Sequence, residues 1–321
     1  MPLPSSTRSQ RSWSNPLSSS DLSSPVMRVH LALFFTMMVW GLNLSAVKVL
    51  TASLDILLVA AVRMALAAGV LAVLAWKWGG ARRRWRAQEW LLLLLAAFFL
   101  VYCQQIAFAG GLARTSATNA SLVMALGPAV SLVLEAMVFR RAILPRQVLG
   151  VLLALCGVAA VVLHRPHAEL TAAALGDAYV LASVLFFALG GLCLQKLTRE
   201  SSPVSVSLVV HVVGALLLWS HVGLSVDAPL IEVGAMGAWQ WGMAAFSAVL
   251  ATGIGSVVWS RGIATIGVGQ TATYLSWVPI FGVTFGALFL AEPVTPWHVA
   301  GLAGVITGTL LVVGFRGRPA K

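Results

Sequence analysis

The sequence predicts an all-α integral membrane protein with ten transmembrane helices, on the evidence of its composition and its long apolar runs. Apolar residues make up 59% of the 321 residues, and charged residues only 10%. Soluble domains carry about 25% charged residues, so too few polar side chains remain here to cover a surface that faces water. Runs such as 91–95 and 209–218 lack the apolar–polar alternation of membrane strands. Helices are therefore favoured over a β-barrel.

Ten segments are long and apolar enough to cross a membrane, which takes about 20 mostly apolar residues per helix. They are residues 31–50, 56–76, 90–112, 116–138, 146–163, 176–195, 204–222, 239–260, 268–290 and 296–315. The linkers between them are short, so consecutive helices are expected to pack antiparallel.

The distribution of charges predicts the orientation in the membrane, because Lys and Arg concentrate in short cytoplasmic loops. With the N-terminus inside, seventeen of the 21 cations fall on the cytoplasmic side. Six of the ten acids fall outside, namely Asp55, Glu169, Asp177, Asp227, Glu232 and Glu292. We therefore predict a multi-pass protein of the cell (inner) membrane with both termini cytoplasmic. The net charge of +11 then reflects topology, and no nucleic-acid partner is expected.

The chain also contains an internal repeat. An offset of 151 residues places Pro128, Pro145, Gly150 and Gly157 on Pro279, Pro296, Gly301 and Gly308. We expect a first five-helix unit at 28–164, an outer linker at 165–175 and a second five-helix unit at 176–315. Because five is odd, the second unit enters the membrane upside down. Inverted repeats of this kind are typical of secondary transporters, whose substrate site lies near the midplane.

The two ends of the chain differ from the rest. Residues 1–27 contain ten serines and four prolines with no apolar run, a composition typical of a disordered, solvated tail. Met27 stands just before the first span and could be an alternative start. Residues 316–321 are predicted to form a basic cytoplasmic C-terminus.

Several short motifs, in order along the chain, carry a family resemblance. They are Trp40-Gly41-Leu42-Asn43, Lys48, Arg63 and Leu126-Gly127-Pro128 in the first unit, and Val278-Pro279, Phe289-Leu290-Ala291-Glu292, Pro296 and Gly301 in the second. The chain resembles the EamA type of the drug/metabolite transporter (DMT) superfamily over about residues 31–315. The resemblance implies a ten-helix exporter of small metabolites, often amino acids or related compounds.

One position departs from the family pattern. The family often keeps an acid in both repeats, but this chain has Arg141 where the second repeat has Glu292. Because the repeats are inverted, Arg141 lies at the cytoplasmic end, where the positive-inside bias favours a cation. We therefore assign no functional acid to that position.

Four amide side chains are candidates for binding substrate, because polar groups inside lipid are costly and are by default functional candidates. Asn43 lies close to the midplane, Gln104 and Gln105 slightly outside it, and Asn119 near the outer end of the fourth span. Amides donate and accept hydrogen bonds, which suits a polar or zwitterionic ligand. Alternatively, these amides hydrogen-bond between helices as a structural element.

Aromatic residues form a second group of candidates. Trp40 and Trp259 lie deep in their spans, and Tyr274 and Trp277 lie beside Pro279. Such rings can stack on a ligand or select for apolar side chains. The alternative is the aromatic belt that many membrane proteins place at the lipid–water interface.

Pro128 and Pro279 fall near the centres of repeat-related spans and are candidate hinges. A proline removes one backbone hydrogen bond and kinks the helix. A kink at the same place in both repeats could shape a cavity or provide a hinge, or could be required for packing alone.

Two charged residues lie within the spans. Glu135 is a candidate for proton coupling, because desolvation raises the pKa of a carboxyl group, but a side chain extending to water at the inner end is favoured. Arg63 lies about two turns from the outer face. It could pair with a helix C-terminus or with a substrate carboxylate, and the structural pairing is favoured.

The remaining motifs narrow the class of function. No His/Asp/Glu cluster has the spacing of a metal site, no Gly-Lys-Ser/Thr motif occurs, and no cofactor is expected. The leading hypothesis is a secondary-active transporter, a monomer or homodimer, that exports a small-molecule substrate across the lipid bilayer by alternating access. A channel or a lipid- or drug-translocating protein is the alternative. An intramembrane enzyme is disfavoured because no positioned nucleophile–base pair is visible.

Overall fold

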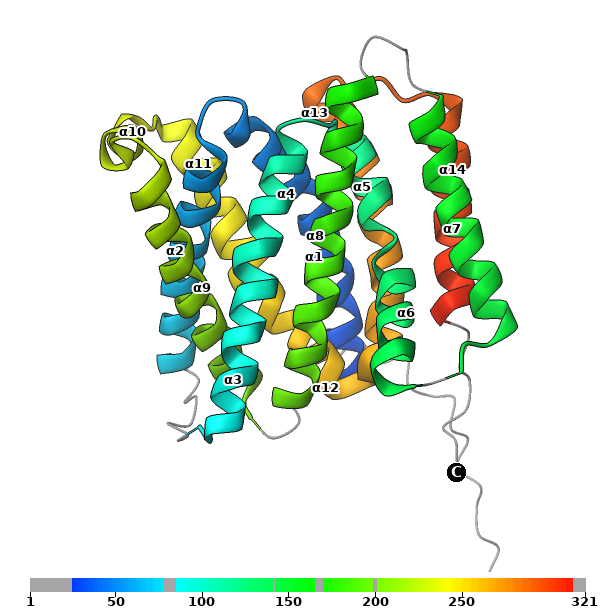
Figure 1. Cartoon of the computed structure of the whole chain (residues 1–321), viewed down its shortest axis with the longest axis horizontal. Coiled ribbons are helices and arrows are strands. Elements are labelled where there is room, and N and C mark those ends of the chain that lie inside the picture. The colour runs from blue at the N-terminus through cyan, green and yellow to red at the C-terminus, as the bar shows by residue number, and fades with distance from the viewer. Residues whose placement is uncertain (1–24, 78–84, 141, 165–169, 199–200, 314–321) are drawn as a thin grey trace, which may run out of the picture.

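The computed structural model describes residues 25–77, 85–140, 142–164, 170–198 and 201–313, and these residues form a bundle of helices (Figure 1). Helical segments cover the ten predicted spans within this part of the chain, and residues 314–315 of the tenth span lie outside it. Most of the predicted tail, part of the linker (165–169) and the basic C-terminus lie outside the described residues. The protein is thus an all-α, multi-pass membrane protein.

The first five spans alternate in direction through the bundle. They are α1 (Pro25–Thr51), α2 (Ile56–Lys77), a third span of α3 (Ala87–Ala96), η1 (Ala97–Cys103) and α4 (Gln104–Leu112), a fourth of α5 (Ala117–Met124) and α6 (Gly127–Phe139), and α7 (Pro145–Leu163). The segment η1 is π-helical, and the fourth span is interrupted at residues 125–126.

The second five spans repeat this plan. They are α8 (Leu170–Leu197), α9 (Pro203–Ser225), an eighth span of α11 (Ala238–Phe246), η3 (Ser247–Ile254) and α12 (Gly255–Thr273), a ninth of η4 (Tyr274–Ser276) and α13 (Trp277–Leu290), and α14 (Pro296–Val313). A short helix, α10 (Pro229–Ala235), joins α9 to the eighth span. By length and composition the first eight spans can cross a membrane, and the last two are shorter apolar helices.

Several predicted boundaries differ from the observed ones. Helix α1 begins at Pro25, inside the predicted tail, and α8 begins at Leu170, inside the predicted linker. The eighth span continues to Thr273, and α13 begins only at Trp277. Hydropathy marks the lipid-crossing part of a helix, but a helix continues beyond it until a residue that disfavours helix intervenes. No proline stands between Gly255 and Thr273 to stop it.

The helix pair α7 and α14 shows that the two units are inverted. A Cβ on Gly150 would lie 2.6 Å from the carbonyl oxygen of Gly308, and one on Gly157 would lie 2.8 Å from that of Gly301. Residues early in α7 therefore face residues late in α14, so the two helices run antiparallel. The offset of 151 residues makes these helices equivalent, so a pseudo-two-fold axis passes between them.

Local backbone features recur at the same offset. Arg140 and Ala291, at the ends of α6 and α13, both adopt a left-handed conformation, with φ of 51° and 52°. The π-helical residues Ala97–Cys103 in η1 correspond to 248–254 in η3. The repeat is thus encoded in backbone geometry even where the side chains have diverged.

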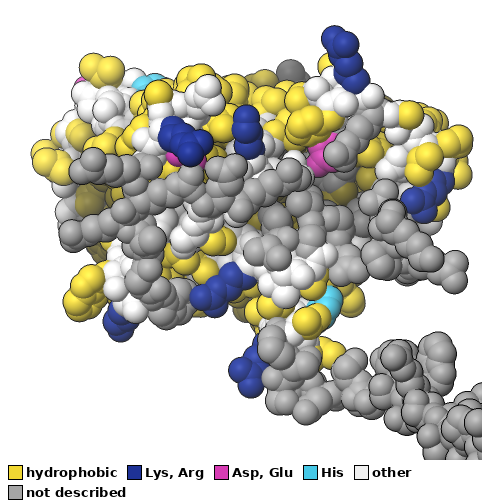
Figure 2. Space-filling model, turned by 90° about the horizontal axis from the view of Figure 1, so that it is seen from below, with side chains coloured by type: hydrophobic (Ala, Val, Ile, Leu, Met, Phe, Trp, Pro, Cys, Tyr) yellow, Lys and Arg dark blue, Asp and Glu magenta, His cyan; other side chains and the backbone are white. Residues whose placement is uncertain are grey.

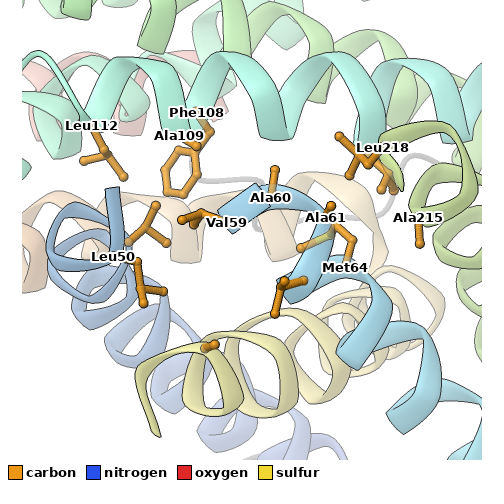
Figure 3. Packing of buried hydrophobic residues seen from close by; sticks show 14 of the residues in the cluster. Leu50, Val59, Ala60, Ala61, Met64, Phe108, Ala109, Leu112, Ala215 and Leu218 are labelled. Atoms are coloured by element: carbon orange, nitrogen blue, oxygen red, sulfur yellow. The ribbon is translucent and has the colours of Figure 1, made fainter. Parts of the chain in front are cut away.

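Helix α2 lies at the centre of the packing (Figure 3). Its small residues Ala60 and Ala61 are fully buried and allow neighbouring helices to approach. Phe108 of α4 and Leu218 of α9 pack around it. Arg63 lies two positions after Ala61 on α2, so this close packing surrounds it.

The two ends of the bundle differ in charge. We call the end where α1 begins and α14 ends the terminal end, and the opposite end the far end. Described basic residues close to helix termini at the terminal end are Arg28, Lys77, Arg86, Arg140, Arg146 and Lys196, against two described acids, Glu89 and Glu135. Figure 2 shows the Lys and Arg side chains scattered over this face, with a few Asp and Glu side chains between them. At the far end the corresponding described residues are Lys48 and Arg114, with the acids Asp55, Asp177, Asp227, Glu232 and Glu292.

Candidate functional site

A cavity of about 190 Å³ lies between the two repeat units. Its lining residues come from every span except the fifth and tenth: Trp40, Asn43, Arg63, Leu100, Gln104, Gln105, Phe108, Met124, Gly127, Ser183, Val184, Phe187, Gly191, Leu194, Ser207, Val210, His211, Ala251, Thr252, Ser256, Trp259, Ser260, Leu275 and Val278. One ordered water needs about 10–15 Å³ by this measure, so the cavity has room for a small organic molecule.

A hydrogen-bonded network centred on Arg63 forms one part of the wall. Arg63 is 1% exposed. Its Nε–H donates to Ser247 Oγ at 2.5 Å, and Nη1–H donates to Gln105 Oε1 at 3.1 Å. Three helical segments, α2, η3 and α4, therefore meet through side chains of both repeat units.

The network continues from Arg63 in two directions. Ser247 Oγ–H donates to Asn43 Oδ1, and Gln105 Nε2–H donates to Gln104 Oε1 at 2.6 Å. In both branches the terminal amide uses its oxygen as the acceptor. The side-chain hydrogen bonds of Asn43 and Gln104 to the described residues involve only their oxygens, and both residues line the cavity.

Aromatic side chains form another part of the wall. Trp40 Nε1–H donates to the carbonyl oxygen of Ala251 at 2.8 Å, which satisfies its polar atom inside the bundle. The Trp40 ring lies 5.6 Å from that of Trp259 and 6.5 Å from that of Phe187, measured between centroids. Gly255 permits this arrangement, because a Cβ there would lie 2.8 Å from Trp40 Nε1.

Two π-helical segments adjoin polar residues of the network. Gln104 follows directly after η1, and Ser247 is the first residue of η3. A π-helical turn contains an extra residue and so changes the direction in which the following side chains point; such turns are frequent at functional sites. A regular α-helix in place of η1 would direct Gln104 and Gln105 elsewhere.

The structure places Asn119, Tyr274 and Trp277 outside the cavity lining. His298 Nδ1 accepts from the backbone N–H of Thr295 at 2.9 Å, so its Nε2–H donates to Asn119 Oδ1 at 3.0 Å. The hydroxyl of Tyr274 lies 2.6 Å from His30 Nδ1. Trp277 is 41% exposed and packs edge-on against a phenylalanine of α1.

The two prolines lie directly after breaks in their spans. Pro128 stands in the first turn of α6, behind the interruption at 125–126, and Pro279 stands in the first turn of α13, behind the 3₁₀ turn η4. The first turn of a helix tolerates proline, because its N–H would have no intrahelical acceptor. Glu135 lies in α6, one turn before its end at Phe139, and is partly buried outside the cavity lining.

Sequence reasoning missed Ser247 of the Arg63 network and several polar residues of the cavity lining, namely Ser183, Ser207, His211, Thr252, Ser256 and Ser260. Ser247 connects Arg63 to Asn43, but serine is common inside membrane helices and gave no signal. His211 was visible as a histidine in an apolar helix. Its Nδ1–H donates to the carbonyl of Ser207 at 2.8 Å, and the residue is buried in the cavity wall.

At the far end, side chains tie the two units together. Glu292, just after α13, accepts from the backbone N–H groups of Ala117 and Thr118 at 2.8 Å each. Lys48 Nζ donates to the carbonyl of Thr115 at 2.7 Å, and the Thr115 hydroxyl donates to Asp177 at 2.8 Å. Three helices from both units thus converge on the start of α5.

Comparison with known proteins places this arrangement among membrane transporters. Residues 27–163 and 174–314 match the EamA-like transporter family. The uncharacterized transporter YyaM of Bacillus subtilis is 25% identical, over 79% of this chain and 83% of its own length. An uncharacterized transporter of Archaeoglobus fulgidus is 25% identical, over 89% and 99%. The probable terminal-alkyne amino-acid exporter of Streptantibioticus cattleyicolor is 25% identical, over 88% and 92%.

A solved crystal structure shares the fold. It covers 89% of this chain and 96% of its own chain, with a TM-score of 0.65 at 14% sequence identity. At that identity the similarity concerns the arrangement of the helices alone.

Proposed function

The chain belongs to the EamA-like transporter family, and on that premise we propose that it is a secondary-active transporter that exports small metabolites by alternating access. The observation that carries the proposal is the cavity between the two repeat units, with Arg63, Asn43 and Gln104 buried in its wall. Inverted-repeat transporters bind their substrates at such an interface. The protein acts as a carrier without a cofactor, and not as an enzyme.

Amino acids or related compounds are the proposed substrates. Polar side chains and aromatic rings line the same cavity, which suits a molecule that has both a charged and an apolar part. One relative is named as a probable amino-acid exporter, and that name supports the proposal.

The proposed orientation has both termini in the cytoplasm of the cell and the far end outside. The basic residues at the terminal end support it, because cytoplasmic loops are enriched in Lys and Arg. Transport from the terminal end to the far end is then export. The functional unit is proposed to be a monomer or a homodimer in the lipid bilayer.

Transport should depend on the cavity amides. In liposomes that contain the purified protein, Asn43→Ala and Gln104→Ala are each expected to raise the KM for counterflow of radiolabelled amino acids by about 3- to 10-fold, the effect of one lost hydrogen bond. Asn119→Ala removes the same kind of amide outside the cavity and is the control, with an unchanged KM expected.

The same assay separates the alternative functions. Saturable exchange supports a carrier, whereas flux that does not saturate would indicate a channel. Unchanged transport in both cavity variants would show that the amides only hold helices together. The absence of flux for every amino acid and metabolite class tested would overturn the proposed function.

A further inference from the structure

We propose that Arg63 is the receptor for a carboxylate group of the transported molecule, so that the substrates are amino acids or other small carboxylic acids with an apolar side chain. The inference rests on the proposed transport function and names the substrate class of the same cavity. It follows from the burial of Arg63, from the direction of its hydrogen bonds and from the aromatic rings that line the same cavity.

Arg63 carries a buried charge that the described residues do not neutralise. Its side chain is 1% exposed, and its two hydrogen bonds end on neutral acceptors, a hydroxyl and an amide oxygen. No carboxylate of the described residues lies within ion-pair distance of it. A buried guanidinium without a counter-charge is costly by several kcal/mol. An anionic group in the cavity would remove that cost.

The direction of the hydrogen bonds makes the wall rich in donors. Guanidinium has only donors, so both branches of the network run outward from Arg63. Each branch ends on an amide oxygen, of Asn43 and of Gln104. Their NH₂ groups are left for a ligand beside the positive charge. An ionised carboxylate accepts hydrogen bonds and donates none, so it matches this set of donors. A cationic primary amine that lacks a carboxylate is repelled by it.

The aromatic rings of the cavity indicate the chemistry of the rest of the substrate. Trp40, Trp259 and Phe187 gather on the cavity wall, and the Phe108 ring centre lies 5.9 Å from the Arg63 guanidinium carbon. Apolar faces of this kind favour an aliphatic or aromatic side chain. The cavity therefore fits a molecule with an anionic head and an apolar body.

The test compares matched ligands in liposomes. Counterflow is measured for radiolabelled L-phenylalanine, with unlabelled L-phenylalanine, 3-phenylpropionate, L-phenylalaninamide and phenethylamine as competitors. In the unmodified protein, counterflow is expected to be inhibited by the two carboxylates, L-phenylalanine and 3-phenylpropionate. L-Phenylalaninamide and phenethylamine should inhibit about 10- to 100-fold more weakly, which is the effect of losing a charge-assisted hydrogen bond. Arg63→Gln is expected to abolish this preference and to raise the KM for phenylalanine by the same factor.

Controls separate a direct contact from a structural role. Arg114→Gln removes an exposed arginine at the far end, where it contacts Gly110 and Tyr179, and should leave the preference intact. Arg63→Lys keeps the charge without the planar fork and should retain a reduced preference for carboxylates. It serves as the test if Arg63→Gln does not accumulate. If Arg63→Gln or Arg63→Lys weakened inhibition by the carboxylates and by L-phenylalaninamide to the same extent, Arg63 would only support the fold.

Two further outcomes distinguish this inference from the proposed function. If the unmodified protein transports phenylalanine but is inhibited equally by all four competitors, transport stands and the carboxylate receptor is overturned. If chloride at the same concentration inhibits as strongly as 3-phenylpropionate, Arg63 is a general anion site and the carboxylate assignment also fails. The absence of saturable exchange for every amino acid and metabolite class tested would instead contradict the proposed function itself.

Discussion

Gly150→Ala is expected to lower the free energy of unfolding of the purified protein by about 1–3 kcal/mol, the usual cost of overpacking. The added methyl group would lie 2.6 Å from the carbonyl oxygen of Gly308 and 2.9 Å from the backbone nitrogen of Val312. Both atoms belong to the backbone of α14, so neither can rotate away as a side chain would. The α7–α14 pair must separate, and the contact that relates the two units is lost.

A matched control shows whether crowding is the cause. Gly69→Ala, in the membrane-spanning helix α2, places the same methyl group where nothing lies within 4 Å. Alanine is favoured over glycine in a helix by about 0.5–1 kcal/mol, so this variant should be as stable as the parent or more so. Thermal unfolding in detergent measures both. A Gly150→Ala protein with the stability of the Gly69→Ala protein would contradict close packing of α7 on α14.

The contact between α7 and α14 also predicts how two substitutions combine. Gly308→Ala meets the carbonyl oxygen of Gly150 at 2.5 Å, so it strains the same contact from the other helix. Once α7 and α14 have separated, a second methyl group adds little. The double variant should therefore be less destabilised than the sum of the two single variants, as is usual for residues in contact.

Glu292→Gln is expected to open the far end of the protein. The carboxylate accepts from the first two N–H groups of α5, and the Ser116 side chain accepts from the third, at Asn119. These groups have no acceptor within their own helix, and a negative charge there also interacts favourably with the helix dipole. The amide keeps only one acceptor oxygen and places its NH₂ group against an N–H.

The expected effect can be measured by labelling. A cysteine introduced by Thr118→Cys should be protected from labelling when Glu292 is retained, because Thr118 is 1% exposed. The substitution breaks no side-chain hydrogen bond, because the Thr118 hydroxyl has no partner among the described residues. Hydrogen bonds to a charged group contribute about 1.5–3 kcal/mol, so in Glu292→Gln the labelling rate with a water-soluble maleimide should rise about tenfold or more.

Two comparisons complete this experiment. The same protein with Thr118 retained reports labelling of the native cysteines, which is subtracted. Asp227→Asn removes an exposed acid at the same end and should leave the rate unchanged. Equal labelling rates in the parent and in the Glu292→Gln variant would show that this carboxylate does not hold the far end closed.

The family and the all-helical membrane fold were predictable because they depend on quantities that add along the chain. Ten apolar segments and an offset of 151 residues each require many residues to agree. The prolines and glycines of the repeat proved informative for the same reason. Gly150 and Gly157 meet Gly308 and Gly301 directly, so a pattern that was only a numerical coincidence in the sequence is a physical contact in the structure.

The candidate site was only partly predictable. Polar residues deep in apolar spans are costly and therefore conspicuous, and Asn43, Gln104, Gln105 and Arg63 do line one cavity. Asn119 is equally polar but bonds to His298 at the far end. Hydropathy gives the depth of a residue along its helix and not the direction in which it points, so it could not separate these cases.

What the sequence by itself determined is the all-α membrane architecture, its ten spans and its internal repeat, because burial in lipid imposes length and composition on every helix. What only the tertiary structure decided is which polar side chains meet. Ser247 accepts from Arg63 and donates to Asn43, and Arg63 has no neutralising partner among the described residues because α4 and η3 present only neutral acceptors to it. Those relations join residues as much as 204 positions apart. They arise from packing between helices, which no local pattern in the chain records.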